Sequence, residues 1–193
     1  MPPRRDVFAA GEYYHIFNRG AGRRTLFFSP ANYEYCLRLA KRHRQRYGAT
    51  IVAYCLMPNH YHLLVRQESD IPLSRFINVV FNAYVQAVNR QEARTGTLFE
   101  GRFRHVWVDS DAYVAHLCRY IHLNPAAGEL VSRPEEWPYS NYLDWIGQRA
   151  GTLRDEEFIR QRFPGPEDYR RFVEDEIGEA RMRAKLKRYL LDE

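Results

Sequence analysis

Two histidines, His60 and His62, are the residues of this chain whose types and spacing point most directly to chemistry. They lie in residues 53–65, an apolar stretch rich in residues that favour β-strands. Side chains alternate between the two faces of a strand, so both imidazoles would share one face. Such a pair could bind a divalent cation. Two histidines on the solvated face of an amphipathic strand would show the same spacing, so the pair alone leaves both interpretations open.

A second set of reactive side chains recurs every four residues in a predicted helix, which begins at the N-cap Ser110 and ends before Pro125. His116, Tyr120 and Asn124 form this polar stripe. A tyrosine close to a proline is also a common packing residue, and Asn124 could serve only to end the helix. These side chains could take part in catalysis only if the helix lies beside the strand that carries His60 and His62.

If the strand and the helix are neighbours, their side chains could carry out a phosphoryl transfer. His60, His62 and the Asn124 amide oxygen would hold one divalent cation with open positions for a phosphodiester. The Tyr120 hydroxyl would then attack phosphorus and form a phosphotyrosine, which a DNA hydroxyl can reverse because a phenol is a tolerable leaving group. Nitrogen ligands suit Mn²⁺ at least as well as Mg²⁺. A zinc hydrolase is an alternative, although it has no evident use for Tyr120.

The elements that must position these side chains follow from hydrophobic periodicity and turn residues. Strands are predicted at residues 12–19, 51–57, 59–67 and 103–108, and long helices at residues 30–47 and 72–94. Pro58 and Asn59 make a tight turn between the two middle strands, which therefore form a hairpin. The order of elements resembles the split β-α-β arrangement of ferredoxin-like folds. We therefore predict an α+β fold, an antiparallel sheet with helices on one face, and a C-terminal helical extension.

Two regions are predicted, residues 1–148 as the main domain and residues 149–193 as the helical extension. Trp137 is the expected hydrophobic anchor of the irregular connector after the Tyr120 helix. Two helical segments flank a Pro-Gly-Pro turn at residues 164–166, and the last carries five basic residues at positions 181–188. That charge run is typical of a solvated helix, although it could also contact a phosphate backbone.

Composition limits the class of protein and its partners. The 193 residues are 45% hydrophobic, which suits one compact domain with a helical extension. A net charge of +5 with 14 tyrosines favours a nucleic acid over a membrane surface as partner. Three separated cysteines predict buried thiols rather than disulfides or a cysteine zinc site. Without an apolar leader or a membrane-length apolar run, we expect a cytoplasmic protein.

The remaining histidines carry no comparable pattern. Each is expected to be structural or exposed, as single histidines in proteins commonly are. They are His15, His43, His105, His116 and His122.

Four motifs together resemble the REP-associated tyrosine transposases, which belong with the single-strand transposases of the HUH (His-hydrophobe-His) superfamily. They are residues 14–20 (YHIFNRG), 57–65 (MPNHYHLLV), 101–103 (GRF) and 119–125 (RYIHLNP). The resemblance runs in consistent order from about residue 13 to residue 142, so it is far more specific than the histidine pair alone.

The resemblance implies a ferredoxin-like HUH nuclease domain that cleaves and rejoins single-stranded DNA at imperfect palindromes folded as hairpins. It implies a divalent metal, Mg²⁺ or Mn²⁺, on His60 and His62, with Asn124 as third ligand. Tyr120 would be the nucleophile that forms a 5′-phosphotyrosine. The protein would act as a monomer or homodimer.

Three residues at motif positions near the DNA, Asn18, Arg19 and Arg102, are candidate DNA contacts by the same resemblance. Arg104, which is close to Arg102 in the sequence, is a fourth candidate. After the last motif the family usually reads Val-Arg-Ala-Gly, whereas this chain has Ala-Ala-Gly-Glu at residues 126–129 and lacks that basic contact. A rival hypothesis is a non-catalytic relative that binds hairpin DNA or structured RNA through its arginines and stacking aromatics. It predicts salt-sensitive, metal-independent binding without cleavage.

Overall fold

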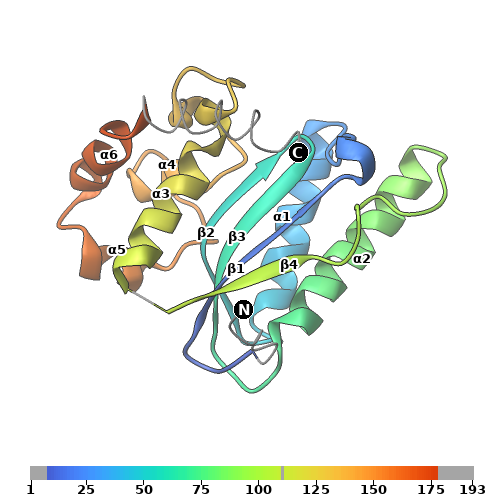
Figure 1. Cartoon of the computed structure of the whole chain (residues 1–193), viewed down its shortest axis with the longest axis horizontal. Helices are drawn as coiled ribbons and strands as arrows, with labels where there is room; N and C mark the ends of the chain where they lie inside the picture. Colours follow the sequence, from blue (N-terminus) through green and yellow to red (C-terminus); the bar gives the residue numbers. More distant parts are fainter. Residues whose placement is uncertain (1–7, 110, 178–193) are drawn as a thin grey trace, which may run out of the picture.

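The protein, seen here as a computed structural model that describes residues 8–109 and 111–177, centres on a four-stranded antiparallel sheet (Figure 1). The strands lie in the order β2-β3-β1-β4. The elements of this core are β1 (Tyr13–Arg19), α1 (Pro30–Arg44), β2 (Ala49–Met57), β3 (His60–Gln67), α2 (Leu73–Gln91) and β4 (Arg104–Val108). The strand order and the two crossover helices confirm the predicted α+β, ferredoxin-like class.

The register of the sheet fixes which side chains surround the histidine pair. Strands β2 and β3 form the predicted hairpin, with Met57 opposite His60 beside the turn. On its other side β3 pairs with β1, where Arg19 is opposite His60 and Phe17 is opposite His62. Directly paired residues of an antiparallel sheet share a face, so the side chains of Phe17 and Arg19 lie on the histidine face.

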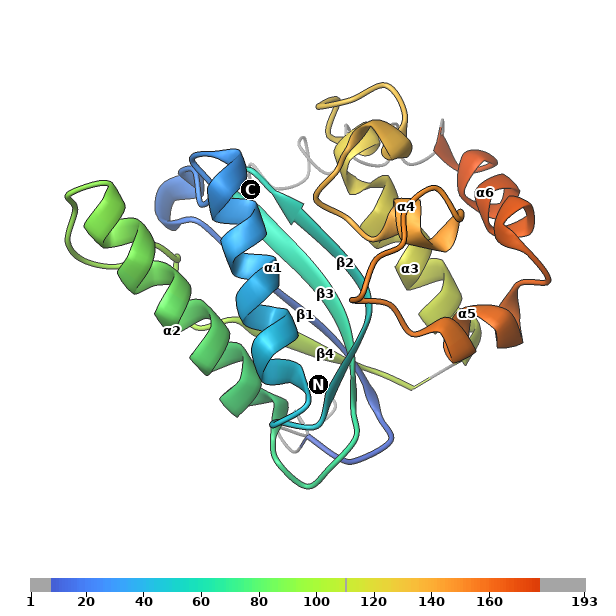
Figure 2. The ribbon, with the colours of Figure 1, turned by 180° about the vertical axis from the view of Figure 1, so that it is seen from behind.

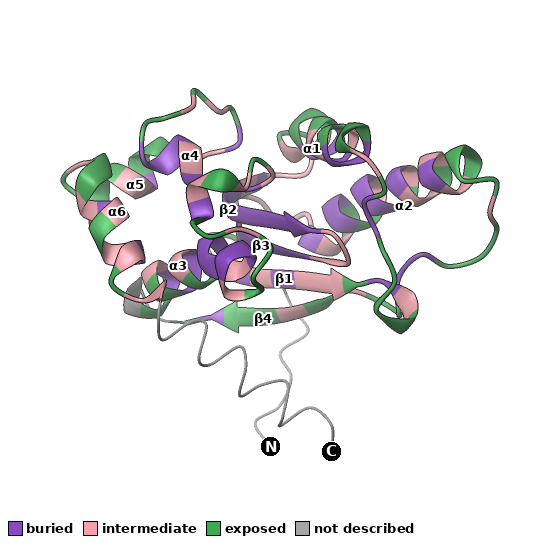
Figure 3. Ribbon diagram, turned by 90° about the horizontal axis from the view of Figure 1, so that it is seen from above, coloured by how far each residue is buried: buried purple, intermediate pink, exposed green. Residues whose placement is uncertain are grey.

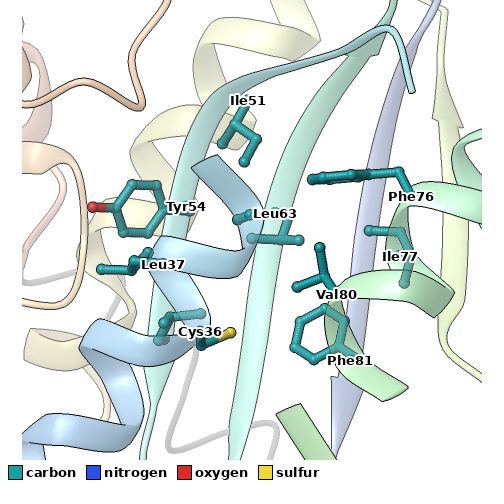
Figure 4. A pocket seen from close by; sticks show the side chains of 11 residues that line it. Cys36, Leu37, Ile51, Tyr54, Leu63, Phe76, Ile77, Val80 and Phe81 are labelled. Carbon is teal, nitrogen blue, oxygen red and sulfur yellow. The ribbon is translucent and has the colours of Figure 1, made fainter. Parts of the chain in front are cut away.

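Helices α1 and α2 cover the other face of the sheet (Figure 2). Leu63 and Val65 of β3 are buried there against Phe76 and Val80 of α2. Figure 4 shows a small apolar space lined by Leu63, Phe76 and Val80 and bordered by Cys36 of α1. Its lining is that of a packed interior, so this space is part of the core rather than a candidate binding site.

Helix α3 (Asp111–Ala127) lies on the histidine face of the sheet, mainly over β2 (Figure 3). Its apolar residues, including Val114, Cys118 and Ile121, are buried against alternate residues of β2 such as Ala53 and Cys55. The sheet therefore carries α1 and α2 on one face, as predicted, and α3 on the opposite one. This arrangement brings the tyrosine helix beside the histidine strand, which the proposed chemistry requires.

The prediction that the helix ends before Pro125 is wrong, because α3 continues past this residue. Proline has no N–H to donate, so the carbonyl of Ile121 loses its usual helical partner. The next turn still closes, with the Gly128 N–H donating to the Asn124 carbonyl at 2.9 Å. One missing hydrogen bond near the end of a helix is tolerated when the flanking turns remain paired. Ser110, the expected N-cap, lies outside the described residues.

The chain after α3 wraps the outer side of that helix (Figure 1). Its elements are η2 (Pro134–Glu136), α4 (Tyr142–Trp145), α5 (Glu156–Arg162) and α6 (Pro166–Glu174). Trp137 is an anchor as predicted, because its indole N–H donates to the Leu56 carbonyl at 3.0 Å. The basic segment at residues 181–188 lies outside the described residues, and the division of the chain at residue 148 stays a prediction.

The three cysteines are buried free thiols, as predicted. Burial raises the pKa of Cys36 to about 12, which keeps this thiol protonated and unreactive. Across the described ranges, no helix is both long enough and apolar enough to cross a bilayer. The cytoplasmic location stays a prediction.

Candidate active site

His60 and His62 project from the same face of β3, and their ring centroids are 5.1 Å apart. The ring planes are nearly perpendicular, at 86°. His62 is buried, and His60 is partly buried. The Nδ1 atom of His60 lies 2.8 Å from the Asn59 Oδ1 atom. Since an amide oxygen only accepts, this bond places the imidazole proton on Nδ1 and leaves Nε2 as the nitrogen that can bind a cation.

A third imidazole, that of His15 on β1, supports His62 from the neighbouring strand. The two rings are stacked with centroids 5.1 Å apart, and His15 Nε2 lies 2.9 Å from His62 Nδ1. When His15 accepts the Nδ1 proton of His62, the Nε2 atom of His62 is left to bind a cation. His15 was expected to be merely structural or exposed, and the structure places it against a candidate ligand.

Tyr120 reaches this group of rings from α3. Its ring stands edge-on to His62 at 81°, with centroids 5.6 Å apart, and lies 6.3 Å from the His15 ring. The side chain is 43% exposed, so a large substrate could reach the hydroxyl. The predicted convergence of a phenol with the imidazole pair is therefore present in the fold.

Asn124 lies one helical turn beyond Tyr120 and contacts the other histidine. Its Nδ2 atom donates to the Tyr120 carbonyl at 3.0 Å, and the amide oxygen remains available as a cation ligand. The Asn124 side chain also lies close enough to His60 to raise the pKa of that imidazole. Burial lowers the pKa of His60, the bond to Asn124 opposes that change, and the charge of Arg19 lowers the pKa further.

This donor set fits a divalent cation. Two imidazole nitrogens and one amide oxygen would leave positions open for phosphate oxygens and water. The lowered pKa of His60 favours the neutral imidazole that a cation requires. In residues 8–109 and 111–177, no cluster of three or more His, Cys, Asp and Glu side chains is placed to hold a metal. A cation bound by the two histidines would therefore need Asn124 as its third protein donor.

Sequence comparison places the chain among known proteins. The family model described as "Transposase IS200 like" matches residues 9–124, which include both histidines, Tyr120 and Asn124. The chain belongs to the IS200-like transposase family. This membership agrees with the tyrosine transposase resemblance of the four motifs.

Two relatives show how far the similarity of this IS200-like transposase extends. A Haemophilus influenzae protein assigned as a REP-associated tyrosine transposase is 27% identical over 108 residues, which cover 51% of this chain and 61% of that protein. The solved structure of a REP-associated tyrosine transposase bound to a REP hairpin superposes with a TM-score of 0.66 at 18% identity, covering 80% of this chain and 94% of that one. The second similarity supports the fold of this transposase.

The candidate DNA contacts of this IS200-like transposase lie where β1 ends and where the chain enters β4. Arg19 donates from Nη2 to Glu100 Oε1 at 2.9 Å, and its Nε donates to the other carboxylate oxygen. Asn18 donates to the Gly101 carbonyl at 3.0 Å and so ties the two segments together. Arg102 and Arg104 are exposed. The predicted role of these four residues in binding DNA stays a prediction.

The sequence did not predict the supporting roles of His15 and Asn59 in this site. His15 and Phe17 alternate along β1, so the sequence places them on one face together. Only the register shows that this face adjoins His62. Asn59 was interpreted as a turn residue, and its side chain also orients His60.

Proposed function

We propose that this transposase is a metal-dependent single-stranded DNA endonuclease and strand transferase, with Tyr120 as its nucleophile. The observation that carries the proposal is the contact of one helix with both histidines. The ring of Tyr120 stands edge-on to that of His62, and Asn124, on the next turn, lies close enough to His60 to raise its pKa. A tyrosine with only a packing role would not require a second polar side chain of the same helix, Asn124, to lie beside the histidine pair.

In the proposed cleavage step, the phenolic oxygen of Tyr120 attacks the phosphorus of a bound phosphodiester. A tyrosine O–P bond forms while the P–O3′ bond breaks, so the 5′ end becomes attached to the protein. The phenol loses its proton, and the departing 3′ oxygen gains one as it becomes a free hydroxyl. The reverse attack by a 3′ hydroxyl rejoins the strand and restores the tyrosine without a nucleotide cofactor.

A divalent cation bound by His60, His62 and Asn124, either Mn²⁺ or Mg²⁺, would supply Lewis-acid polarisation of a non-bridging phosphate oxygen. Side chains of the protein itself orient the reacting groups. Asn59 and His15 fix the ring orientation of the two histidines, and the packing of α3 keeps the phenol on the same face. Orientation of this kind lowers the entropic cost of bringing nucleophile and phosphate together.

The proposed substrate is single-stranded DNA that folds into hairpins at repeated sequences. Three observations support this substrate: the name of the Haemophilus influenzae relative, the REP hairpin bound in the solved structure, and the net charge of +5 of this chain. Arg19, Arg102, Arg104 and Asn18 would contact the DNA backbone near the cleavage point. We propose a monomer or homodimer as the active form.

The test is a search for a covalent adduct between the protein and a hairpin oligonucleotide with a single-stranded flank. In the presence of Mn²⁺ or Mg²⁺, the unsubstituted protein should give an adduct that survives a denaturing gel. Tyr120→Phe should abolish it and retain hairpin binding, because only the nucleophilic oxygen is lost. Tyr113→Phe is the matched control, since Tyr113 is an exposed tyrosine on the same helix.

Two outcomes would contradict the proposal. An undiminished adduct from Tyr120→Phe would remove Tyr120 as the nucleophile. Salt-sensitive hairpin binding without an adduct under any metal condition would instead favour the non-catalytic binding protein.

A further inference from the structure

Glu100 lies among three guanidinium groups beside the end of β1. Arg19 forms two hydrogen bonds to its carboxylate, one of them at 2.9 Å. The bonds from Arg19 and the charges of Arg104 and Arg23 lower the pKa of Glu100. Glu100 is thus ion-paired with Arg19 and acted on by the charges of Arg23 and Arg104, and this Glu100 cluster (Arg19, Arg23, Arg104 and Glu100) has an excess of positive charge.

The Glu100 cluster borders the candidate active site. Arg19 is directly opposite His60 in the register of β1 and β3. Asn59 connects the two features, because its Nδ2 donates to the Arg23 carbonyl at 3.3 Å and its Oδ1 contacts the His60 ring at 2.8 Å. A phosphate bound at the cluster would therefore lie close to a phosphate bound near His60.

The loop that carries Arg23 has an unusual backbone. Arg23 has a φ of +59° and the preceding Gly22 a φ of +62°, both in the left-handed region. Gly20 allows a close approach, since a Cβ there would lie 2.0 Å from the Arg24 carbonyl oxygen. A non-glycine residue in the left-handed region costs free energy, and such residues concentrate at functional sites. The strained residue of this loop, Arg23, is one of the three arginines whose charges act on Glu100.

Arginine recognises carboxylate and phosphate oxygens with the same forked geometry. We propose that Glu100 occupies a binding site for a DNA backbone phosphate in the DNA-free protein, and that bound DNA displaces it from Arg19. This inference rests on the proposed function, because it requires that the site binds single-stranded DNA. Glu100 would weaken binding to arbitrary DNA, since every strand must first break the ion pair with Arg19.

The experiment measures the affinity for a fluorescently labelled single strand without hairpin potential, by anisotropy at several salt concentrations in EDTA. Glu100→Gln frees Arg19 and should tighten binding roughly two- to fivefold at low salt, the range expected for an exposed ion pair. The slope of log K against log salt should become more negative by about 0.7, as expected for one more phosphate contact on a single strand. In an Arg19→Gln background, Glu100→Gln should have no such effect.

Glu34→Gln is the matched control, because it removes the same charge and an exposed ion pair with Arg38 on α1. If Glu100→Gln binds no more tightly than Glu34→Gln, or more weakly than the unsubstituted protein, Glu100 does not compete with phosphate and the inference is overturned. The proposed nuclease would still stand in that case. If the unsubstituted protein binds neither this strand nor a hairpin, both the inference and the proposed function fail.

Discussion

Acidification should destabilise this protein through His122 of α3, a buried histidine. Its side chain is inaccessible to solvent, with Nδ1 2.5 Å from the Tyr169 hydroxyl and Nε2 2.9 Å from Asn141 Oδ1. Asn141 donates through Nδ2 to the carbonyls of Val52 and Leu153, so its oxygen must accept from His122. Nε2 therefore carries the proton and Nδ1 accepts from Tyr169. A second proton, on Nδ1, would break this bond or force the Tyr169 hydroxyl to reverse from donor to acceptor.

The magnitude follows from the pKa of this imidazole. Burial lowers the pKa of His122 from 6.5 to about 4, although the bond to Asn141 opposes the change. Between these values the unfolded chain binds a proton that the folded protein does not. Stability is therefore complete above pH 6.5 and falls as the pH drops toward 4. The full loss is about 3 kcal/mol and the loss at pH 5 about 2 kcal/mol, against roughly 5–15 kcal/mol for a whole domain.

The assay is urea unfolding between pH 7.5 and 4.5 in EDTA, for the unsubstituted protein and for His122→Gln. Glutamine can still donate to Asn141 but does not titrate, so the variant should lose less stability on acidification. The difference between the two profiles should change by about 2 kcal/mol between pH 7.5 and 5. His60, whose pKa is also lowered, is present in both proteins and its contribution cancels. Parallel profiles would refute the reasoning.

Two further predictions concern the metal site and the packing of the C-terminal region. His15→Phe keeps an aromatic ring against His62 but removes the bond to the Nδ1 atom of His62. The affinity for Mn²⁺ should therefore fall roughly 10- to 100-fold in calorimetric titration. An unchanged affinity would show that His15 only packs against His62. Gly151→Ala should lower the free energy of unfolding by about 1–3 kcal/mol, because its Cβ would lie 1.9 Å from the buried Asp144 carboxylate. Gly101→Ala has no atom within 4 Å of its Cβ and is the control; equal losses would contradict this prediction.

The sequence was sufficient for whatever depends on local periodicity. The period of two in residues 59–67 placed His60 and His62 on one face, and the structure confirms it. Helical spacing is equally readable, since Val114, Cys118 and Ile121 recur three or four residues apart on one face of α3 and are buried together. These patterns are readable because a strand or a helix buries one side whatever its neighbours are.

Contacts that depend on strand register or on residues distant in the sequence could not be predicted from local patterns. Nothing in residues 12–19 says that His15 will lie beside His62, since that contact exists only once β1 has paired with β3 in one register. Pro125 was expected to end its helix because proline lacks a donor, but the flanking hydrogen bonds and burial of Pro125 outweigh that single loss. Local rules give way where tertiary packing supplies more free energy than one hydrogen bond.

The position of the tyrosine helix is the decisive case, because residues outside every motif help to determine it. Asn141 joins β2 to α3 through Val52 and His122, and α6 contributes the Tyr169 hydroxyl to the same buried chain of hydrogen bonds. Nearby, Arg119 donates to the Phe172 carbonyl at 3.1 Å. All the partners of α3 in these contacts except Val52 follow the segment that matches the family. Motifs identify the reacting groups, whereas the distance between the phenol and the imidazoles depends on this external support.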